Sequence, residues 1–297
     1  MEFKKWALTL FAAGTLVTSP APCVAQTSEI EASKASIEYV TVEKEEYPFL
    51  NDKIGTVIFD RWTEENLKTM TNAACNCSVK NFIFCDSITS GLAMIKSGRA
   101  DFLMTTDITA NYVARRNHDL KAINTPGGLE IVMSMRSSDG ALKDSFDAAI
   151  KKLKETGKLA ELETKWIKEL PVGQEPAAAK IEKASDTAET IYVGVSGDMP
   201  PLDYIAADGK PAGFNIALLA EISKLTGKNI EVVSMDSQAR FTALESKKID
   251  VFFWMVFVSD PSVKELMKQN PDEQSMNKKF IFTDPHCIVK TGFILKK

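Results

Sequence analysis

Residues 92–106 read LAMIKSGRADFLMTT, and residues 241–256 read FTALESKKIDVFFWMV. In both stretches, apolar residues three or four apart indicate a helix, which is followed by a polar turn, an aspartate and an apolar strand. A β-rich run ending in an Asp-Ser pair precedes each helix, at residues 81–87 and 230–237. The chain therefore repeats a strand–helix–strand unit, which builds a parallel sheet with helices on its faces and predicts the α/β fold class.

Further predicted elements flank these units. Residues 191–195 predict a β-branched strand, and residues 213–226 predict an amphipathic helix that ends before Gly227. Residues 129–135 predict a strand and residues 141–155 a helix, followed by a short helix with Leu159, Leu162 and Trp166. Between the halves, residues 171–190 contain two prolines and no aromatic residue, which is typical of a linker.

The N-terminus has the order of regions that marks a secretory signal peptide. Lys4 and Lys5 precede an apolar run at residues 6–17 that is too short to span a bilayer. We expect cleavage after Ala25, a polar lead-in at residues 26–49 and a periplasmic mature protein; a lipid anchor on Cys23 is the less favoured alternative. A net charge of −4 and the lack of a second spanning run predict no nucleic-acid partner and no stable membrane insertion.

Four cysteines follow the predicted signal peptide, namely Cys75, Cys77, Cys85 and Cys287. In an oxidising compartment, Cys85 is expected to pair with Cys75 or Cys77, because those loops are short. The alternative is a metal site built from the same three cysteines. It lacks a nearby histidine and the two-residue spacing of common zinc sites, so we predict no metal.

The motifs of catalysis are missing from the sequence. The histidines, His118 and His286, have no serine, cysteine and acid arrangement around them, and no paired carboxylates or phosphate-binding loop occur. We therefore predict no catalytic set of residues and no cofactor. Asp198 and Tyr204 follow the end of the strand at residues 191–195, where α/β proteins gather their ligand sites.

Several stretches resemble the amino-acid class of type II periplasmic binding proteins, the bacterial extracellular solute-binding proteins of family 3. Residues 191–204, IYVGVSGDMPPLDY, resemble the opening of lobe one in that family. Residues 208–215, DGKPAGFN, resemble the start of its first helix, and residues 282–285, FTDP, resemble the motif before its crossover strand. The turn at residues 97–101 resembles that of lobe two, and residues 157–166 resemble the C-terminal helix. The resemblance covers roughly residues 50–170 and 190–297, and it implies two lobes with a cleft between them.

The order of these stretches differs from that of the family. There, the Val-Gly-Val strand opens the mature chain and the Lys-Trp helix closes it, whereas here the helix comes first. This implies a circular permutation, with lobe two at residues 50–128 and lobe one built from residues 129–170 and 191–297. Termini that lie close together tolerate being joined, and a linker at residues 171–190 suits that join. A dimer with exchanged lobes is the alternative.

The binding positions implied by the resemblance also differ from the family pattern. Ser262 stands where the family has its carboxylate-binding arginine. The glycine-rich turn of lobe two corresponds to residues 59–63, where Arg61 is either a substitute cation or solvated, and Trp254 is either in the cleft or in the core. From the missing cation we predict weak binding of common α-amino acids. The candidate ligand-binding residues are Asp198, Met199, Tyr204, Ser237, Trp254, Met255, Phe257, Arg61, Trp62, Thr63, Thr106 and Asp107.

Together these features predict an exported solute-binding protein that captures a small molecule for an ABC-type permease or a receptor. A degenerate member of the family that acts as an interaction domain is the alternative. An enzyme on the same frame is less favoured, because a fold does not fix function and no acid–base set is present.

Overall fold

A computed structural model describes residues 46–58, 62–125, 128–170, 179–258 and 271–297. The predicted signal peptide and its cleavage site lie outside the described residues, as do Arg61 and Ser262. Within the described part of the chain, no helix combines the length and the apolar character needed to cross a membrane.

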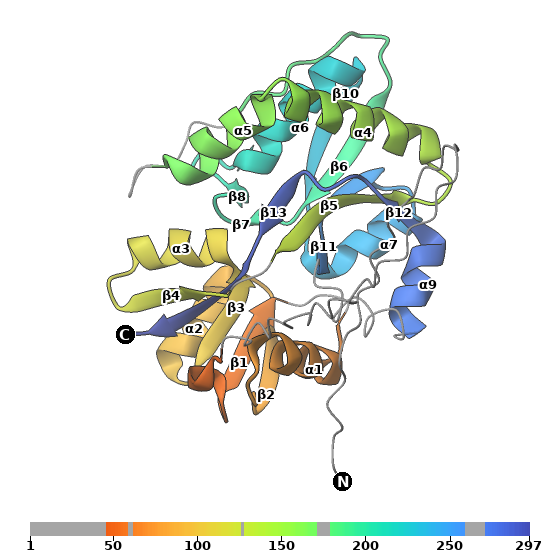
Figure 1. The fold of residues 1–297 in the computed structure, drawn as a ribbon. Helices are drawn as coiled ribbons and strands as arrows, with labels where there is room; N and C mark the ends of the chain where they lie inside the picture. Colours follow the sequence, from red (N-terminus) through yellow and green to blue (C-terminus); the bar gives the residue numbers. More distant parts are fainter. Residues whose placement is uncertain (1–45, 59–61, 126–127, 171–178, 259–270) are drawn as a thin grey trace, which may run out of the picture. The chain divides into compact units, whose positions relative to one another are not determined.

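The first sheet has the strand order β2-β1-β3-β14-β4. Strand β1 (Ile54–Ile58) runs parallel to β2 (Asn81–Cys85) and β3 (Phe102–Thr106), as the strand–helix–strand pattern predicts. The C-terminal strand β14 (Thr291–Lys296) lies antiparallel between β3 and β4 (Leu120–Asn124) (Figure 1). A segment nearly two hundred residues away in sequence therefore completes this sheet.

Three helices accompany the first sheet, and a hydroxyl side chain begins each one. They are α1 (Glu64–Cys75), α2 (Ile88–Ser97) and α3 (Asp107–Arg116). Each hydroxyl, of Thr63, Ser87 or Thr106, accepts a hydrogen bond from the backbone N–H of the residue three positions later, and Ser87 does so within a capping box. These caps satisfy N–H groups that have no partner within the helix.

The second sheet has the strand order β10-β6-β11-β5-β12. Strands β10 (Asn229–Ser234), β6 (Thr190–Val195) and β11 (Val251–Val258) are parallel, whereas β5 (Leu129–Arg136) is antiparallel to β11. The antiparallel strands β12 (Phe280–Phe282) and β13 (Cys287–Val289) both pair with β5. The remaining α-helices are α4 (Gly140–Glu155), α5 (Lys158–Glu163), α6 (Phe214–Thr226), α7 (Arg240–Glu245) and α9 (Pro271–Lys279). There are also the short 3-10 helices η1 (Pro48–Leu50) and η3 (Ser237–Ala239) and the π-helix η2 (Thr164–Lys168). A small sheet contains β7 (Asp198–Met199), β8 (Asp203–Ile205) and β9 (Pro211–Ala212).

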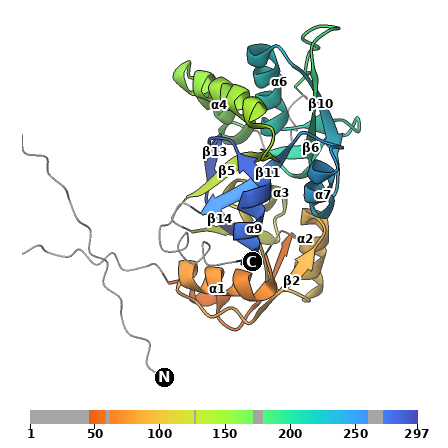
Figure 2. The same ribbon diagram turned by 90° about the vertical axis from the view of Figure 1, so that its right-hand side faces the viewer.

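One core joins stretches from both sides of residues 171–178. Phe146, Ile150 and Trp166 come before this segment, whereas Val193 and Phe214 come after it, and all five are buried in the same hydrophobic cluster. Figure 2 shows α4 and α6 near each other, as their shared core requires. The two large sheets contain both parallel and antiparallel strands and are accompanied by helices, which confirms the α/β class predicted from the sequence.

The described part of the predicted linker is attached to the second sheet. Ala179 and Ile181 pack against the main core. The Asn229 side chain accepts a hydrogen bond from the Ala184 N–H at 2.8 Å and donates to the Ser185 carbonyl at 2.8 Å. This stretch has no regular structure, yet a side chain of β10 fixes its backbone.

The chain passes from the second sheet to the first at Lys290. Strand β13 ends at Val289 and β14 begins at Thr291. The Asp107 N–H donates to the Lys290 carbonyl and the Lys290 N–H donates to the Asp107 carboxylate, both at 2.9 Å. A Cβ on Gly292 would lie 2.7 Å from the Asp107 Cα, so only glycine permits this close approach.

Candidate functional site

A cavity of about 230 Å³ receives side chains from elements of both sheets. From the first sheet and α1 come mainly apolar groups, including Val57, Leu67, Met70, Met104 and Phe293. The segments that follow β6 and β10 contribute four polar side chains, namely Ser196, Asp198 of β7, Ser237 of η3 and Arg240 of α7. These segments begin at the carboxyl ends of parallel strands, where α/β sheets usually hold ligands.

Asp203 fixes the loop that carries Ser196 and Asp198. Its carboxylate is fully buried and accepts hydrogen bonds from the Gly197 N–H at 2.7 Å, the Ser196 hydroxyl at 3.3 Å and the Asn215 side-chain amide at 2.9 Å. Gly213 lets the backbone of α6 approach this loop, because a Cβ there would lie 2.5 Å from the Leu202 carbonyl oxygen. A buried carboxylate needs such donors to remain charged.

Asp198 is the acidic side chain among the described residues that line the cavity. Burial raises the pKa of the Asp198 carboxyl above its usual value, and the hydrogen bond from Ser196 and the positive charge of Arg240 oppose that rise. One carboxylate oxygen, Oδ1, is buried and has no hydrogen-bond partner within the described part of the chain. Asp198 therefore offers an acceptor, or a donor when it is protonated, toward a bound solute.

Arg240 is the basic side chain among the lining residues that the structure describes. It is the first residue of α7, which follows β10 and η3, and only 7% of its surface is exposed. Its guanidinium carbon lies 5.5 Å from the ring centre of Phe252 and 5.7 Å from that of Phe241. Such distances suit a cation–π interaction, which helps to offset the cost of burying the charge.

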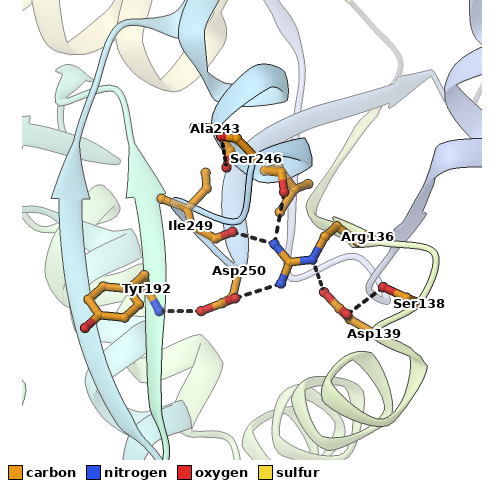
Figure 3. Close-up of polar contacts among 9 residues, drawn as sticks. Arg136, Ser138, Asp139, Tyr192, Ala243, Ser246, Ile249 and Asp250 are labelled. Atoms are coloured by element: carbon orange, nitrogen blue, oxygen red, sulfur yellow. Dashed lines mark hydrogen bonds and ion pairs between the residues drawn. The ribbon is translucent and has the colours of Figure 1, made fainter.

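The other end of α7 is fixed by Arg136, the last residue of β5 (Figure 3). The Arg136 guanidinium donates to the carbonyls of Leu244 at 3.0 Å and Ile249 at 2.6 Å. It also pairs with the carboxylates of Asp139 and Asp250, both at 2.7 Å. The cluster therefore ties the C-terminal turn of α7 to β5.

The structure brings together part of the predicted site. Trp62, Thr106, Asp198, Met199 and Ser237 all line the cavity. Their contribution to ligand binding stays a prediction.

Other predicted residues occupy structural positions. Tyr204 is buried in β8, opposite Asp198 of β7, and Met255 lies in a hydrophobic cluster with Leu244. The ring of Phe257 stacks edge-on against that of Phe282, with centres 4.9 Å apart. Thr63 caps α1, and Asp107 binds the backbone of Lys290. Arg61 and the Trp254 side chain lie outside the described residues.

Arg240 is the main residue that sequence reasoning missed. Two sequence features could have indicated it: the arginine follows the end of a predicted strand, and it directly precedes the helix predicted from residue 241. Helix dipoles disfavour a cation at that end, so an arginine there suggests another role.

The structure corrects the expected disulfide, because all four described cysteines are free thiols. Cys75 lies in the cluster around Tyr47 and Leu67 and lines the cavity, whereas Cys85 packs in a separate cluster with Ile88 and Ile95. Burial, followed by the neighbouring Cys77, raises the pKa of the Cys75 thiol to about 12. A buried thiol of this kind is chemically inert. Within the described residues, no three histidine, cysteine, aspartate or glutamate side chains form a group that could hold a metal ion.

Comparison with known proteins gives one family model, two partly matching relatives and a set of solved structures. Residues 191–297 match the model of "Bacterial extracellular solute-binding proteins, family 3". The L-cystine-binding protein TcyJ of Escherichia coli (strain K12) is 27% identical over 108 residues, which are 36% of this chain and 35% of that protein. The probable ABC transporter arginine-binding protein ArtJ of Chlamydia trachomatis serovar D is 27% identical over 86 residues, 29% of this chain and 34% of that protein.

The chain therefore spans about a third of the length of these curated relatives. Among solved structures, the L-cystine solute receptor of Neisseria gonorrhoeae in its unliganded open conformation is 12% identical, with a TM-score of 0.35. That alignment covers 84% of this chain and 80% of the receptor.

Proposed function

We propose that this chain, whose residues 191–297 match the model of the bacterial extracellular solute-binding proteins of family 3, captures a small solute in the cavity between its two sheets and delivers it to an ABC-type importer or a receptor. The observation that carries the proposal is the composition of the cavity wall. Polar groups follow β6 and β10, and an apolar wall comes from α1 and the first sheet. Ligand sites usually combine a mainly apolar lining with a few placed polar groups.

The relatives support a binding role rather than catalysis. TcyJ and ArtJ are both named as binding proteins, the latter as part of an ABC transporter. Two described residues that line the cavity, Asp198 and Arg240, carry groups of opposite charge, which suit recognition of a charged or polar solute. We propose that the protein works outside the cytoplasmic membrane, where the predicted signal peptide would send it.

We also propose that the chain is a circular permutation of the family's usual order. The family match begins at residue 191 and runs to residue 297. Residues 129–170 come earlier in the chain, yet β5, α4 and Trp166 share the sheet and core of the matched segment. A family-like lobe assembled from two stretches in this order is what a permutation would produce.

Native mass spectrometry of the purified protein tests the binding function. We expect a population whose mass exceeds that of the chain by one small molecule, and the excess should vanish on denaturation. Ala74→Phe provides the site-directed arm, because Ala74 is an exposed residue of α1 whose side chain lines the cavity. A phenyl group there fills space, so we expect the bound fraction to fall at least about tenfold.

Ala160→Phe is the matched control, since Ala160 is an exposed residue of α5 that does not line this cavity. The control should keep the bound molecule. Equal binding by both variants would place the ligand elsewhere. A wild-type protein that carries no molecule, and takes up none from an extract of small metabolites, would refute solute capture.

A further inference from the structure

One side of the cavity extends along α1. Five residues of this helix line it, at positions three or four apart on one helix face, namely Leu67, Met70, Thr71, Ala74 and Cys75. Between Leu67 and Cys75 the helix rises by about 12 Å. Helix α1 therefore borders the cavity over two turns rather than at a single point.

A row of apolar side chains on the first sheet faces α1. Val57 of β1, Met104 of β3 and Phe293 of β14 line the cavity, and Met104 is the cross-strand partner of the other two. Side chains at partnered positions stand on the same face of a sheet. The Thr71 hydroxyl donates to the Met104 Sδ at 3.7 Å, so this face is the one that packs against α1. The space between the lining face of α1 and this row is called the α1 groove below.

The α1 groove has one firm side and one adaptable side. The ring of Phe293 is fully buried and packs edge-on against those of Phe49 and Phe102, with centres 6.0 and 5.5 Å apart. Met70 and Met104 are half-buried, and the flexible thioether chain of methionine adjusts to whatever lies against it. Such a groove can accept an apolar chain without a change in the underlying core.

The chemistry of the α1 groove is apolar. Among the described lining residues, α1 and the strands of the first sheet contribute no charged side chain. The Thr71 hydroxyl is bonded to Met104, and burial, followed by the neighbouring Cys77, raises the pKa of the Cys75 thiol to about 12 and keeps it neutral. A charged group placed here would lose its hydration without gaining a partner. The polar lining residues that could hold such a group come instead from the segments that follow β6 and β10.

We infer that the α1 groove holds an apolar tail, and that the solute is a small amphiphile with an unbranched hydrocarbon chain and one polar head. This inference rests on the proposed solute-binding function and assigns a ligand class to its cavity. The volume of about 230 Å³ sets the size of the ligand. An apolar cavity of roughly 150 Å³ holds a benzene molecule, so by proportion this one holds about nine non-hydrogen atoms. 1-Octanol is a molecule of that size.

Titration calorimetry with 1-butanol, 1-hexanol, 1-octanol and 1-decanol tests the tail without placing a charge on the head. Each buried methylene should raise the affinity of the wild-type protein about fourfold. The rise should end near 1-octanol, because the cavity is then full, and 1-decanol should bind no more tightly. An affinity that does not depend on chain length, or that keeps rising to 1-decanol, would overturn a bounded groove as the place of the tail.

Ala74→Phe locates the tail, because this exposed residue near the C-terminal end of α1 lines the cavity. We expect the affinity for 1-octanol to fall at least about tenfold, whereas that for 1-butanol should change less than about twofold, since the short chain leaves the groove partly empty. An unchanged affinity for 1-octanol would overturn the assignment of the groove. If Ala74→Phe fails to fold, the smaller side chain of Ala74→Leu gives the same comparison.

Thr69→Phe is the matched control, because it adds the same ring to an exposed position of α1 that does not line the cavity. It should keep the wild-type dependence on chain length, and equal losses in both phenylalanine variants would overturn the assignment.

The inference and the binding function can fail separately. Wild-type protein that carries a small molecule in native mass spectrometry but binds none of the alcohols keeps the binding function and overturns the amphiphile. Protein that binds the alcohols with the expected profile, but takes up nothing from a metabolite extract, supports the groove and refutes solute capture.

Discussion

At the scale of single residues, His286 stands in an unusual environment. Its side chain is 1% exposed, its ring packs edge-on against Phe253 with centres 5.2 Å apart, and neither ring nitrogen has a hydrogen-bond partner among the described residues. Burial, reinforced by the charge of Lys154, lowers the pKa of the His286 imidazole from 6.5 to about 3. The folded protein therefore keeps this imidazole neutral in mildly acidic solution.

This shift predicts a loss of stability in acid. Between pH 6.5 and about 3, the unfolded chain binds a proton at His286 that the folded protein does not, so the free energy of unfolding falls as the pH falls. From pH 7 to pH 5, His286 should account for about 2 kcal/mol of that loss. His286→Phe removes the titrating group and preserves the edge-on stack, so its urea-unfolding free energy should fall less over the same interval by about this amount.

His118→Gln is the control for that comparison, because His118 is exposed on the turn after α3. Its pH dependence should match that of the wild type. A His286→Phe variant whose free energy of unfolding falls as steeply with acid as the wild type's would show that the imidazole already takes up its proton in the folded state.

At the scale of elements, α7 links the cavity to the rest of the second sheet. The helix is short, running from Arg240 to Glu245, and short helices have little stability of their own. Its first residue lines the cavity, and its last turn is held by the Arg136 cluster. Arg136 therefore positions the element that carries Arg240, although it does not line the cavity itself.

Removing the Arg136 side chain should strongly destabilise the protein. Arg136→Met leaves the carboxylates of Asp139 and Asp250 without their cation in a site that is only 15–24% exposed. We expect the free energy of unfolding to fall by about 3 kcal/mol in urea titrations. Lys279→Met is the matched control, because Lys279 of α9 forms an ion pair with Glu245 of α7 at 2.8 Å, and this pair lies on an exposed surface. Its cost should stay below about 1 kcal/mol, and equal losses in both variants would contradict the positioning role of Arg136.

The elements with a strong sequence pattern were predictable to within a residue or two. The strand at residues 81–85, the helix predicted at 213–226 and the helix predicted at 141–155 are confirmed by β2, α6 and α4. Apolar periodicity and glycine stops determine these elements locally. The two-residue strands β7 and β9 were not predicted, because such short elements depend on tertiary contacts rather than on periodicity.

The cavity was less predictable than the elements around it. Asp198 and Ser237 follow strand ends, which the sequence indicates, whereas Met70, Met104 and Phe293 belong to other elements with ordinary core-like patterns. Nothing in a local pattern tells which apolar residue faces a cavity and which faces the core. Phe257 illustrates the same difficulty, because its partner Phe282 comes from a strand more than twenty residues later.

At the scale of the whole molecule, two strands connect distant parts of the chain. Strand β5 precedes residues 171–178 and lies between β11 and β12, which follow them. Strand β14 comes from the C-terminus and lies between β3 and β4. The stretches before and after residue 175 are therefore joined by backbone hydrogen bonds in both sheets, independently of the covalent link between them.

This topology predicts that the folded protein stays assembled after its chain is cleaved. A protease site inserted between residues 171 and 178 should yield two fragments that co-elute from a size-exclusion column, because each completes a sheet and a core begun by the other. Cutting removes only the connection, which adds a modest entropic term. The fragments should separate in concentrated guanidinium chloride, which serves as the control. Elution of two separate folded fragments in native buffer would instead indicate two independent domains, and elution of the uncut protein as a dimer would favour lobes exchanged between two chains.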